Sequence, residues 1–233
     1  VGVIDSAQAS AELASRGRTL YEVRLRRGAT VDDDTVKPRV VGGSDVVITG
    51  GLGGLGLHIT PWLLSHRATS VVLTSRSGQV TRDGQGLDVQ LKTLLSRSKR
   101  DVLVRVSDAG IIEDLVALLH EQPHLSAFMH APHVIRDRTI YAMTPASVHA
   151  DVPAVFSAKA MGASNVTNAF ATRRAHFGVL FSSTASLGAM GVACHSAGNV
   201  YLDSLALNAR GGGFAMSRCV ISPDLPLDPH PFP

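Results

Sequence analysis

The residues best suited to chemistry are the glycines of one short turn. The chain reads Thr49-Gly-Gly-Leu-Gly-Gly-Leu-Gly56 between an apolar segment and an amphipathic one. The spacing G-x-G-x-x-G permits a tight turn, a close approach of backbone to a pyrophosphate and close packing of helix on strand. Free N–H groups at a helix start attract phosphate, so the turn predicts a dinucleotide site rather than a plain flexible loop. The residues expected to bind there are Thr49, Gly51, Leu52, Gly53, Gly54, Leu55 and Gly56.

The residue at the end of the second expected strand indicates which dinucleotide fits. An NAD-binding domain has an acidic residue there for the ribose 2′-hydroxyl, whereas this chain has Ser75-Arg76-Ser77. An arginine pairs with a 2′-phosphate, so Ser75 and Arg76 favour NADP(H), and a solvated surface arginine is the competing interpretation. Ser107 and Asp108 follow the third expected strand, where a side chain meets the adenine ring or merely forms a turn.

Short apolar runs that alternate with longer amphipathic segments must position these residues. This alternation predicts an α/β fold of the Rossmann type, a doubly wound parallel sheet flanked by helices. The strands expected are Asp45–Thr49, Ser70–Ser75, Val102–Val106, Ala127–His130, Gly178–Ser182 and Ala215–Val220. The helices expected are Leu55–Ser65, Leu87–Arg97, Ile111–His120, Pro145–Thr172 with Thr144 as its cap, and Val192–Ala209.

Three parts are expected along the chain. Residues 1–44 form an N-terminal extension and linker, with a helix around Ala7–Ser15, a strand over Leu20–Leu25 and a polar run from Arg26 to Ser44. Residues 45–222 form the NADP(H)-binding domain. Residues 223–233 form a proline-rich tail, which continues neither helix nor sheet. Because the chain starts at Val1 without an initiator methionine, we expect a piece of a longer polypeptide.

Composition narrows the class of function. The formal net charge of +3 is spread out and lacks the clustered face of a nucleic-acid binder. No apolar run is long enough to span a bilayer, so neither nucleic acid nor membrane is an expected partner. The chain has 2 cysteines, too few for a disulfide framework, and its histidines are scattered without a metal-ligand pattern. We expect a cytoplasmic protein without a metal site.

The motifs in their order resemble a known family. After the glycine turn come Leu73-Thr-Ser-Arg76, His130-Ala131, Lys159, Phe181-Ser-Ser183, and Asn199 followed by Tyr201-Leu-Asp-Ser-Leu-Ala206. Together they resemble ketoreductase domains of modular type I polyketide synthases, members of the short-chain dehydrogenase/reductase superfamily. The likeness runs from about Asp45 to Val220, and Arg16 to Leu25 looks like the lead-in that precedes such domains.

The resemblance implies a reaction and a role for each site residue. In the family, NADPH reduces a β-keto thioester, carried on the phosphopantetheine arm of an acyl carrier protein, to a β-hydroxy thioester. The hydroxyl that binds the ketone is implied at Ser183, with Ser182 as the alternative register. Lys159 and Asn199 match the lysine and asparagine that support the acid, and His130 and Ala131 match residues beside the cofactor. Donors aimed at an oxygen that gains charge stabilise the transition state.

The family's catalytic tyrosine is missing from this chain. Where the family has Tyr-x-x-x-Asn, the chain reads His195-Ser-Ala-Gly-Asn199. A slip in the alignment would leave Tyr201 as the nearest tyrosine, but it lies beyond Asn199 where the family has an aromatic packing residue. We therefore place His195 at the acid position. An imidazole has a suitable pKa, but its nitrogen lies closer to the backbone than a phenol oxygen, and a misplacement of about 1 Å costs on the order of a hundredfold in rate.

Other departures point the same way. His130-Ala131-Pro132-His133 replaces His-Ala-Ala-Gly and puts bulk beside the expected nicotinamide. Val134-Ile-Arg136-Asp137 keeps only part of the Val-Leu-Asp-Asp of one stereochemical class, so product stereochemistry stays open. After Val220 the chain does not continue into the family's lid helix and last strand. Either the piece is truncated there or both elements are absent, and their absence would leave the acyl pocket open and a sheet edge exposed.

Two functions remain open at this point. One is an NADPH-dependent reductase of carrier-bound β-keto thioesters within a megasynthase, impaired by His195. The other is a non-reducing domain that serves as a scaffold or an epimerase in such a synthase. A third, free-standing ketone reductase fits less well with the lead-in segment and the missing methionine.

Overall fold

The computed structural model describes residues 13–16, 19–22, 42–80, 85–98, 101–173, 175–188 and 190–221. The chain divides into two compact units, Val1–Lys37 and Pro38–Pro233. In the first unit, strands β1 (Leu13–Arg16) and β2 (Thr19–Glu22) pair in antiparallel register. The tail from residue 222 onward and most of the run from Arg26 to Ser44 lie outside the described residues.

The helix expected around Ala7–Ser15 is wrong for Leu13–Ser15. These residues belong to β1, with Leu13 opposite Glu22 and Ser15 opposite Leu20. A helix this short is marginal in water because its first turn costs more entropy than one hydrogen bond returns. Pairing with a neighbouring strand supplies backbone partners instead. The strand expected over Leu20–Leu25 is confirmed for the residues that β2 includes, and the rest lies outside the described residues.

The second unit contains a six-stranded parallel sheet in the order β5-β4-β3-β6-β7-β8. Its strands are β3 (Asp45–Thr49), β4 (Ser70–Ser75), β5 (Val102–Val106), β6 (Ala127–His130), β7 (Phe177–Ser183) and β8 (Met216–Ile221). The bounds of the first four strands agree with the sequence prediction, β7 is longer by one residue at each end, and β8 is displaced by one residue toward the C-terminus. This order is the doubly wound arrangement predicted from the alternation of apolar runs.

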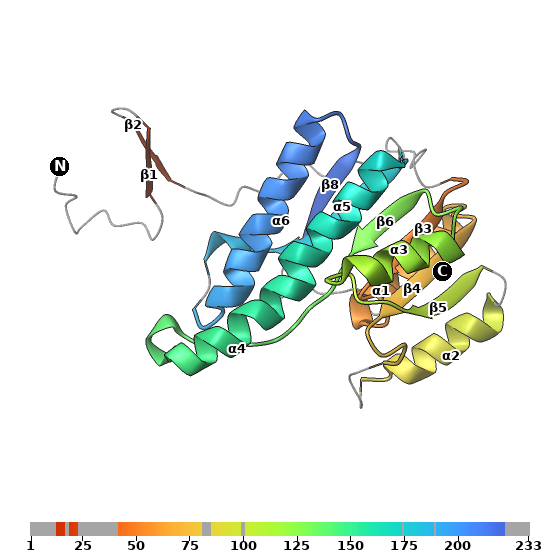
Figure 1. The fold of residues 1–233 in the computed structure, drawn as a ribbon, viewed down its shortest axis with the longest axis horizontal. Helices are drawn as coiled ribbons and strands as arrows, with labels where there is room; N and C mark the ends of the chain where they lie inside the picture. The colour runs from red at the N-terminus through yellow and green to blue at the C-terminus, as the bar shows by residue number, and fades with distance from the viewer. Residues whose placement is uncertain are drawn as a thin grey trace. The chain divides into compact units, whose positions relative to one another are not determined.

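Helices cover both faces of this sheet (Figure 1). They are α1 (Gly54–Ser65), α2 (Leu87–Arg97), α3 (Ile112–Glu121), α4 (Pro145–Phe156), α5 (Gly162–Thr172) and α6 (Ala193–Gly211). Alternate strand residues face opposite layers. Val46 and Ile48 of β3 pack with leucines of α1 and α2, whereas Val47 packs with residues of α3, α5 and α6. Burial of both faces explains why these strands read as continuous apolar runs.

The chain reverses direction across the sheet between β3 and β6. From β3 it winds outward through β4 and β5, then crosses to β6 on the other side of β3. In sheets of this kind, ligands bind at the carboxyl ends of the two strands that flank the reversal. Thr49 and His130 end these strands and lie directly opposite each other in the register. The topology therefore brings the glycine turn and the residues after β6 to the same edge.

The long helix expected over Pro145–Thr172 is interrupted. The π-turn η3 (Ser157–Met161) separates α4 from α5, and the N–H of Gly162 donates to the carbonyl of Ser157. Such a widened turn inserts one residue into the helix and re-aims the side chains that it carries. Helical periodicity does not reveal it, because its cause is a contact with a distant strand, described below. The start of α4 is as predicted, with Thr144 as its cap.

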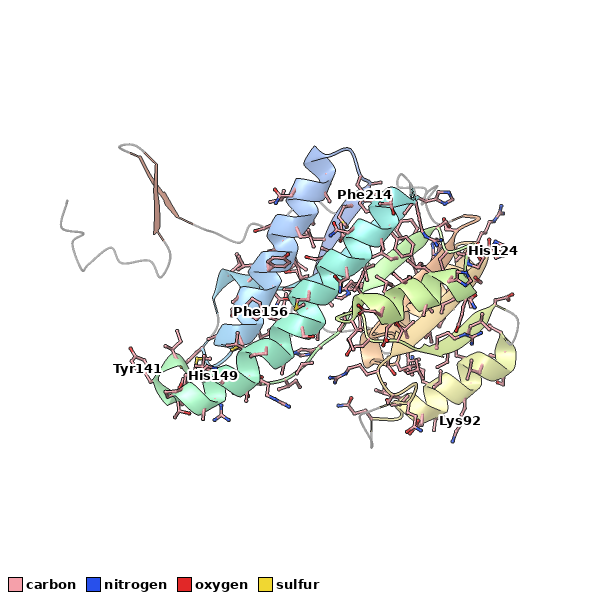
Figure 2. The ribbon with its side chains drawn as sticks, in the orientation of Figure 1. Lys92, His124, Tyr141, His149, Phe156 and Phe214 are labelled. Atoms are coloured by element: carbon pink, nitrogen blue, oxygen red, sulfur yellow. The ribbon has the colours of Figure 1, made fainter. Side chains whose placement is uncertain are left out.

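Aromatic rings fill the layer beneath α5 and α6. The ring of Phe128 lies 5.1 Å from that of Phe170 and 6.1 Å from that of Phe214, centroid to centroid. Phe214, labelled in Figure 2, belongs to the link from α6 to β8. A Cβ atom at Gly178 of β7 would lie 2.6 Å from Phe128 Cζ and 2.9 Å from Met216 Sδ. Close packing of these rings therefore depends on a glycine at position 178.

β8 forms one edge of the sheet. Within the described residues it pairs with β7 alone, and Ser217 through Val220 are exposed. An edge strand presents unpaired backbone groups to whatever lies beside it.

The aromatic layer leads to a prediction about stability. Gly178→Ala should lower the free energy of unfolding by about 1–3 kcal/mol, because the added methyl overpacks a filled core. The matched control is Gly211→Ala in the last turn of α6, where a Cβ would meet nothing within 4 Å. Urea unfolding followed by circular dichroism measures both. Equal stability of the two variants would contradict the packing described here.

Candidate functional site

The glycine turn between β3 and α1 is held by its own backbone. The N–H of Gly51 donates to the carbonyl of Thr74 at 2.9 Å, and the N–H of Gly53 donates to the carbonyl of Gly50 at 3.1 Å. Gly50 has φ of 70°, in the left-handed region that favours glycine. These bonds tie the turn to β4 and close it tightly.

Two glycines of the turn have no room for a side chain. A Cβ at Gly51 would lie 2.6 Å from the carbonyl oxygen of Ile48, and one at Gly56 would lie 2.5 Å from the Cα of Gly51. Gly53 and Gly54 instead are exposed, and a Cβ at Gly54 would make only an ordinary contact, 3.8 Å from Leu87 Cδ2. The turn is therefore packed on its inner side and open on its outer side.

The open side fits a diphosphate. No side chain caps the start of α1, and its first turn carries no acidic residue. The first N–H groups of a helix lack intrahelical partners and carry partial positive charge. Because Gly54 at the start of α1 is exposed, these groups leave donors for an anion, and the first turn has no carboxylate to compete with it.

Arg76 lies just beyond the end of β4 and is exposed. It makes no hydrogen bond or ion pair with any other residue that the structure describes, whereas Ser75 has a weak bond to the carbonyl of Gln79 at 3.5 Å. Its guanidinium is therefore available to a ligand. The geometry agrees equally with the alternative of a solvated side chain.

Ser107 and Asp108 are occupied by local structure. The N–H of Ser107 donates to the carbonyl of Ser75 at 3.1 Å. The Asp108 carboxylate accepts the N–H of Gly110 at 2.9 Å, and the N–H of Asp108 donates to the Asp114 carboxylate. This arrangement is the turn that the sequence left as the alternative to an adenine contact, and it places both residues near Ser75.

His130 is buried beside the turn and uses both ring nitrogens. Nε2 lies 3.1 Å from the carbonyl oxygen of Lys159, which only accepts, so Nε2 carries the proton. Nδ1 then accepts from the hydroxyl of Thr49 at 2.8 Å. Burial and the charge of Lys159 lower the pKa of His130 to about 3, so the ring is neutral. No ring nitrogen remains for a direct bond to a cofactor, although Ala131, which bonds the carbonyl of Thr49, stays partly exposed.

Lys159 lies in the π-turn and is 4% exposed. Its Nζ donates to Asn199 Oδ1 of α6 at 2.8 Å. Burial lowers the pKa of Lys159 from 10.5 to about 8, and the Asp203 carboxylate acts in the opposite direction. The Asn199 side chain donates in turn to the carbonyl of His195 at 2.9 Å. The two expected residues Lys159 and Asn199 are thus joined directly.

The two serines at the end of β7 differ in availability. Ser182 is buried and its hydroxyl points to the carbonyl of Asn199 at 3.4 Å. Ser183 is only partly buried, and its oxygen accepts from the N–H of Ala185, so its own proton is not used in that bond. Of the two serines, Ser183 is therefore the one better able to donate a hydrogen bond to a ligand.

His195 lies in the first turn of α6, next to this group of residues. Its ring lies 4.7 Å, centroid to centroid, from that of His133, which follows β6, with the two ring planes tilted by 41°. Nδ1 of His195 is buried and has no hydrogen-bond partner among the residues that the structure describes. Burial, Lys159 and His133 lower the pKa of His195 to about 4, and Asp137 opposes them. The imidazole is therefore neutral at physiological pH.

Tyr201 does not take the place of His195. Its hydroxyl lies 2.6 Å from the Ser164 hydroxyl, on an exposed part of α5 and α6. The tyrosine is thus engaged on the helix surface, as expected for a packing residue.

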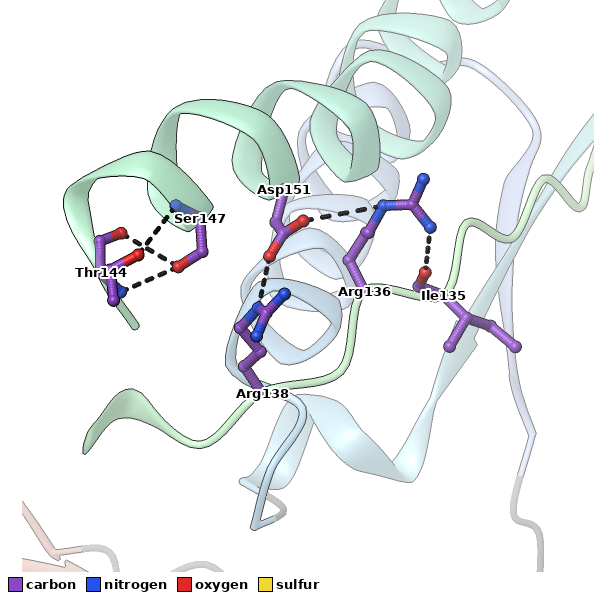
Figure 3. A network of polar contacts seen from close by, with 6 residues as sticks. All are labelled: Ile135, Arg136, Arg138, Thr144, Ser147 and Asp151. Carbon is purple, nitrogen blue, oxygen red and sulfur yellow. Dashed lines mark hydrogen bonds and ion pairs between the residues drawn. The ribbon is translucent and has the colours of Figure 1, made fainter. Parts of the chain in front are cut away.

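A buried carboxylate that the sequence analysis missed holds the segment after β6. Asp151 of α4 is 5% exposed and accepts from Arg138 Nε at 2.9 Å, with Arg136 Nε at 3.7 Å (Figure 3). Arg138 also forms a bridge with Val192 just before α6. The ion pairs therefore fasten the loop after β6 to α4, and the bridge at Arg138 joins the same loop to the residue before α6.

Two helical glycines were also missed. A Cβ at Gly162 would lie 2.9 Å from His130 Cε1, and one at Gly198 would lie 3.1 Å from Lys159 Cδ. Glycine inside a helix costs about 1 kcal/mol relative to alanine, so each was a signal in the sequence that something packs closely there.

Two further findings concern the described residues only. They contain no group of three or more histidine, cysteine, aspartate or glutamate side chains arranged to hold a metal ion. None of their helices has the length and apolarity that crossing a membrane requires.

Comparison with known proteins places this site in a family. Residues 44–221 match the family model described as the KR domain. The chain is 33% identical over 207 residues to a component of the phenolphthiocerol/phthiocerol polyketide synthase of Mycobacterium tuberculosis, covering 86% of this chain and 11% of that protein. It is 31% identical over 225 residues to polyketide synthase GfsA of Streptomyces halstedii, covering 96% of this chain and 3% of that protein. The chain thus spans a small part of each relative.

Solved structures agree in fold. An A1-type ketoreductase has a TM-score of 0.74 at 31% identity, over 91% of this chain and 44% of that one. The first ketoreductase of the tylosin polyketide synthase has a TM-score of 0.69 at 26% identity, over 89% of this chain and 43% of that one. The matched part, the doubly wound sheet and the Lys159–Asn199 pair lead to one conclusion: the chain belongs to the KR domain family, the ketoreductase domains of polyketide synthases.

Proposed function

We propose that this domain binds NADPH and that its reduction of β-keto thioesters is impaired because a neutral histidine stands at the acid position. The observation that carries the proposal is the state of His195, whose pKa is lowered to about 4 beside an intact Lys159–Asn199 pair. The domain retains the parts that bind and orient, and has lost the part that donates a proton.

Several features support NADPH as the cofactor. Ketoreductases of this superfamily use nicotinamide cofactors. The open side of the glycine turn offers backbone donors for the diphosphate. Arg76, exposed and uncommitted within the described residues, is positioned after β4, where a cation selects the 2′-phosphate. Ser75, Ser107 and Asp108 border the same edge of the sheet.

Residues at the end of β7, in the π-turn and in α6 have different roles in reducing the ketone. When bound, the reduced nicotinamide supplies a hydride to the ketone carbon. The Ser183 hydroxyl donates to the ketone oxygen and stabilises the charge that develops there. Lys159 adds a positive charge, held in place by Asn199. The remaining requirement is a proton for the oxygen, which the family takes from a tyrosine.

His195 meets that requirement poorly. Above about pH 4 its imidazole carries no extra proton, and a neutral imidazole N–H is a far weaker acid than an imidazolium. General acid catalysis contributes about 10²–10⁴-fold to a rate, so the loss is of this size. The ring of His133 also lies beside His195, 4.7 Å away centroid to centroid.

The same observation favours a second candidate, a non-reducing domain kept as a scaffold or an epimerase. In that case the cofactor binds but no ketone is reduced. The two candidates differ in turnover and agree in cofactor binding, so one pair of measurements separates them.

Partners follow from the relatives, which are polyketide synthases many times longer than this chain. We propose that the domain acts within a cytoplasmic megasynthase, on a β-keto thioester carried by the phosphopantetheine arm of an acyl carrier protein.

Cofactor choice yields one prediction. Arg76→Ala should weaken NADPH binding by about 10- to 100-fold, because a charge-assisted hydrogen bond contributes about 1.5–3 kcal/mol, and should leave NADH binding unchanged. Isothermal titration calorimetry with both dinucleotides measures this. Arg97→Ala, an exposed arginine at the far end of α2, is the matched control. If Arg76→Ala and Arg97→Ala bind NADPH equally, Arg76 is a solvated surface residue.

Another prediction concerns His195 at the acid position. His195→Tyr should raise the rate of NADPH oxidation by a β-keto thioester at neutral pH at least about 100-fold, because a phenol beside the Lys159 cation restores a proton donor. His120→Tyr, an exposed histidine of α3, makes the same exchange away from the site and should change nothing. Wild-type turnover as fast as that of His195→Tyr would show that the imidazole is a competent acid. No turnover in either protein, with NADPH bound, favours the non-reducing domain.

A further inference from the structure

A continuous chain of buried hydrogen bonds joins the glycine turn to α6. The Thr49 hydroxyl donates to His130, His130 donates to the Lys159 carbonyl, and Lys159 Nζ donates to Asn199. Asn199 then donates to the carbonyl of His195. The first four members are each no more than 4% exposed. Among these hydrogen-bonded residues, His130 alone bonds both Thr49 of the turn and the segment that carries Lys159.

The partner of His130 is the backbone of the π-turn. In a regular helix the carbonyl of Lys159 would accept an N–H from the next turn of the same helix. Here it lies 3.1 Å from His130 Nε2, and the N–H of Gly162 reaches the carbonyls of both Lys159 and Ser157. A side chain that inserts into the hydrogen-bond ladder is a recognised cause of a local break in a helix.

Two glycines allow close packing around the His130 ring and the Lys159 side chain. A Cβ at Gly162 would approach His130 Cε1 to 2.9 Å, so the glycine lets α5 lie against the imidazole. A Cβ at Gly198 would approach Lys159 Cδ to 3.1 Å, so a second glycine lets the stem of the lysine lie against α6. α5 thus packs against the ring at Gly162, α6 packs against the lysine stem at Gly198, and the lysine Nζ reaches Asn199.

We infer that His130 is a positioning residue: its Nε2–H holds the carbonyl of Lys159 and thereby fixes the π-turn that seats the Lys159 ammonium beside Asn199. The Nδ1 bond to Thr49 fixes the tautomer that makes Nε2 the donor. The role of Lys159 in reduction rests on the proposed function, whereas the placement of its ammonium beside Asn199 is a property of the protein without ligand.

Two substitutions separate the two bonds of the ring. His130→Gln has an amide N–H that reaches toward the carbonyl of Lys159, and His130→Asn has an amide oxygen at the distance of Nδ1, which keeps only the bond to Thr49. The readout is the pKa of Lys159, followed by NMR of selectively ¹³C-labelled lysine in the full chain without cofactor. The chain has lysines only at positions 37, 92, 99 and 159, so Lys159→Arg assigns the signal.

In the wild type, burial keeps the pKa of Lys159 at about 8. His130→Asn should raise it toward the ordinary value by about one unit or more, because the released turn exposes the ammonium to water. His130→Gln should keep the wild-type value. Gly178→Ala, which is destabilised elsewhere in the core, should also keep the wild-type pKa of Lys159. This control separates displacement of Lys159 from a general loss of stability. An unchanged Lys159 pKa in His130→Asn would overturn the inference.

A measurement on the wild type needs no substitution. A long-range ¹H–¹⁵N spectrum should show His130 as the neutral tautomer protonated at Nε2, and it should stay neutral down to about pH 4, since burial lowers its pKa to about 3. A ring protonated at Nδ1, or charged at neutral pH, would overturn the inference even if the variants fail to fold. Neither experiment uses NADPH, so a failure of cofactor binding leaves these results intact and bears only on the proposed function.

Discussion

The structure depends on one buried imidazole at the point where the sheet reverses. Thr49 and His130 end neighbouring parallel strands in register, and the hydrogen bond between their side chains joins the turn to the far half of the sheet. A neutral polar group inside a protein is costly unless each of its donors and acceptors has a partner. The ring satisfies this on both sides, through the hydroxyl of Thr49 and the carbonyl of Lys159. Its low pKa and its single tautomer are consequences of that arrangement.

From this point the site divides into a preserved part and an altered part. His130 and the Lys159–Asn199 pair are buried, and their side chains have hydrogen-bond partners. Around His195 the opposite holds, since its Nδ1 is buried without a partner and its ring rests on His133. An unsatisfied buried atom at this position agrees with the replacement of a longer side chain by a shorter one. The proposed impairment therefore lies in the supply of a proton and not in the framework of the site.

Much of the fold and of the site could be predicted from the sequence, because the signals for these features are local in the chain. The bounds of β3, β4, β5 and β6 agree because each strand is a short apolar run bounded by turn residues. The glycine turn was visible because its function needs glycine at fixed spacing. The π-turn, the bonds of His130 and the Asp151 ion pairs were not visible, because each joins residues far apart in the chain. The helix expected at Leu13–Ser15 failed for the same reason, since pairing with β2 outweighed a weak local preference. Gly162 and Gly198 stood in the sequence as clues, each a glycine where a helix would favour alanine.

The account claims that this domain binds the reduced dinucleotide normally and is slowed at proton transfer. The most direct test is a single-turnover stopped-flow experiment on the wild-type domain, in which nicotinamide fluorescence reports binding and nicotinamide absorbance reports oxidation by a β-keto thioester. The account predicts a rapid, saturable binding phase followed by oxidation that is slow in water and slower still in heavy water, because the proton moves in the limiting step. Oxidation as rapid as binding, or the absence of any binding phase, would contradict it.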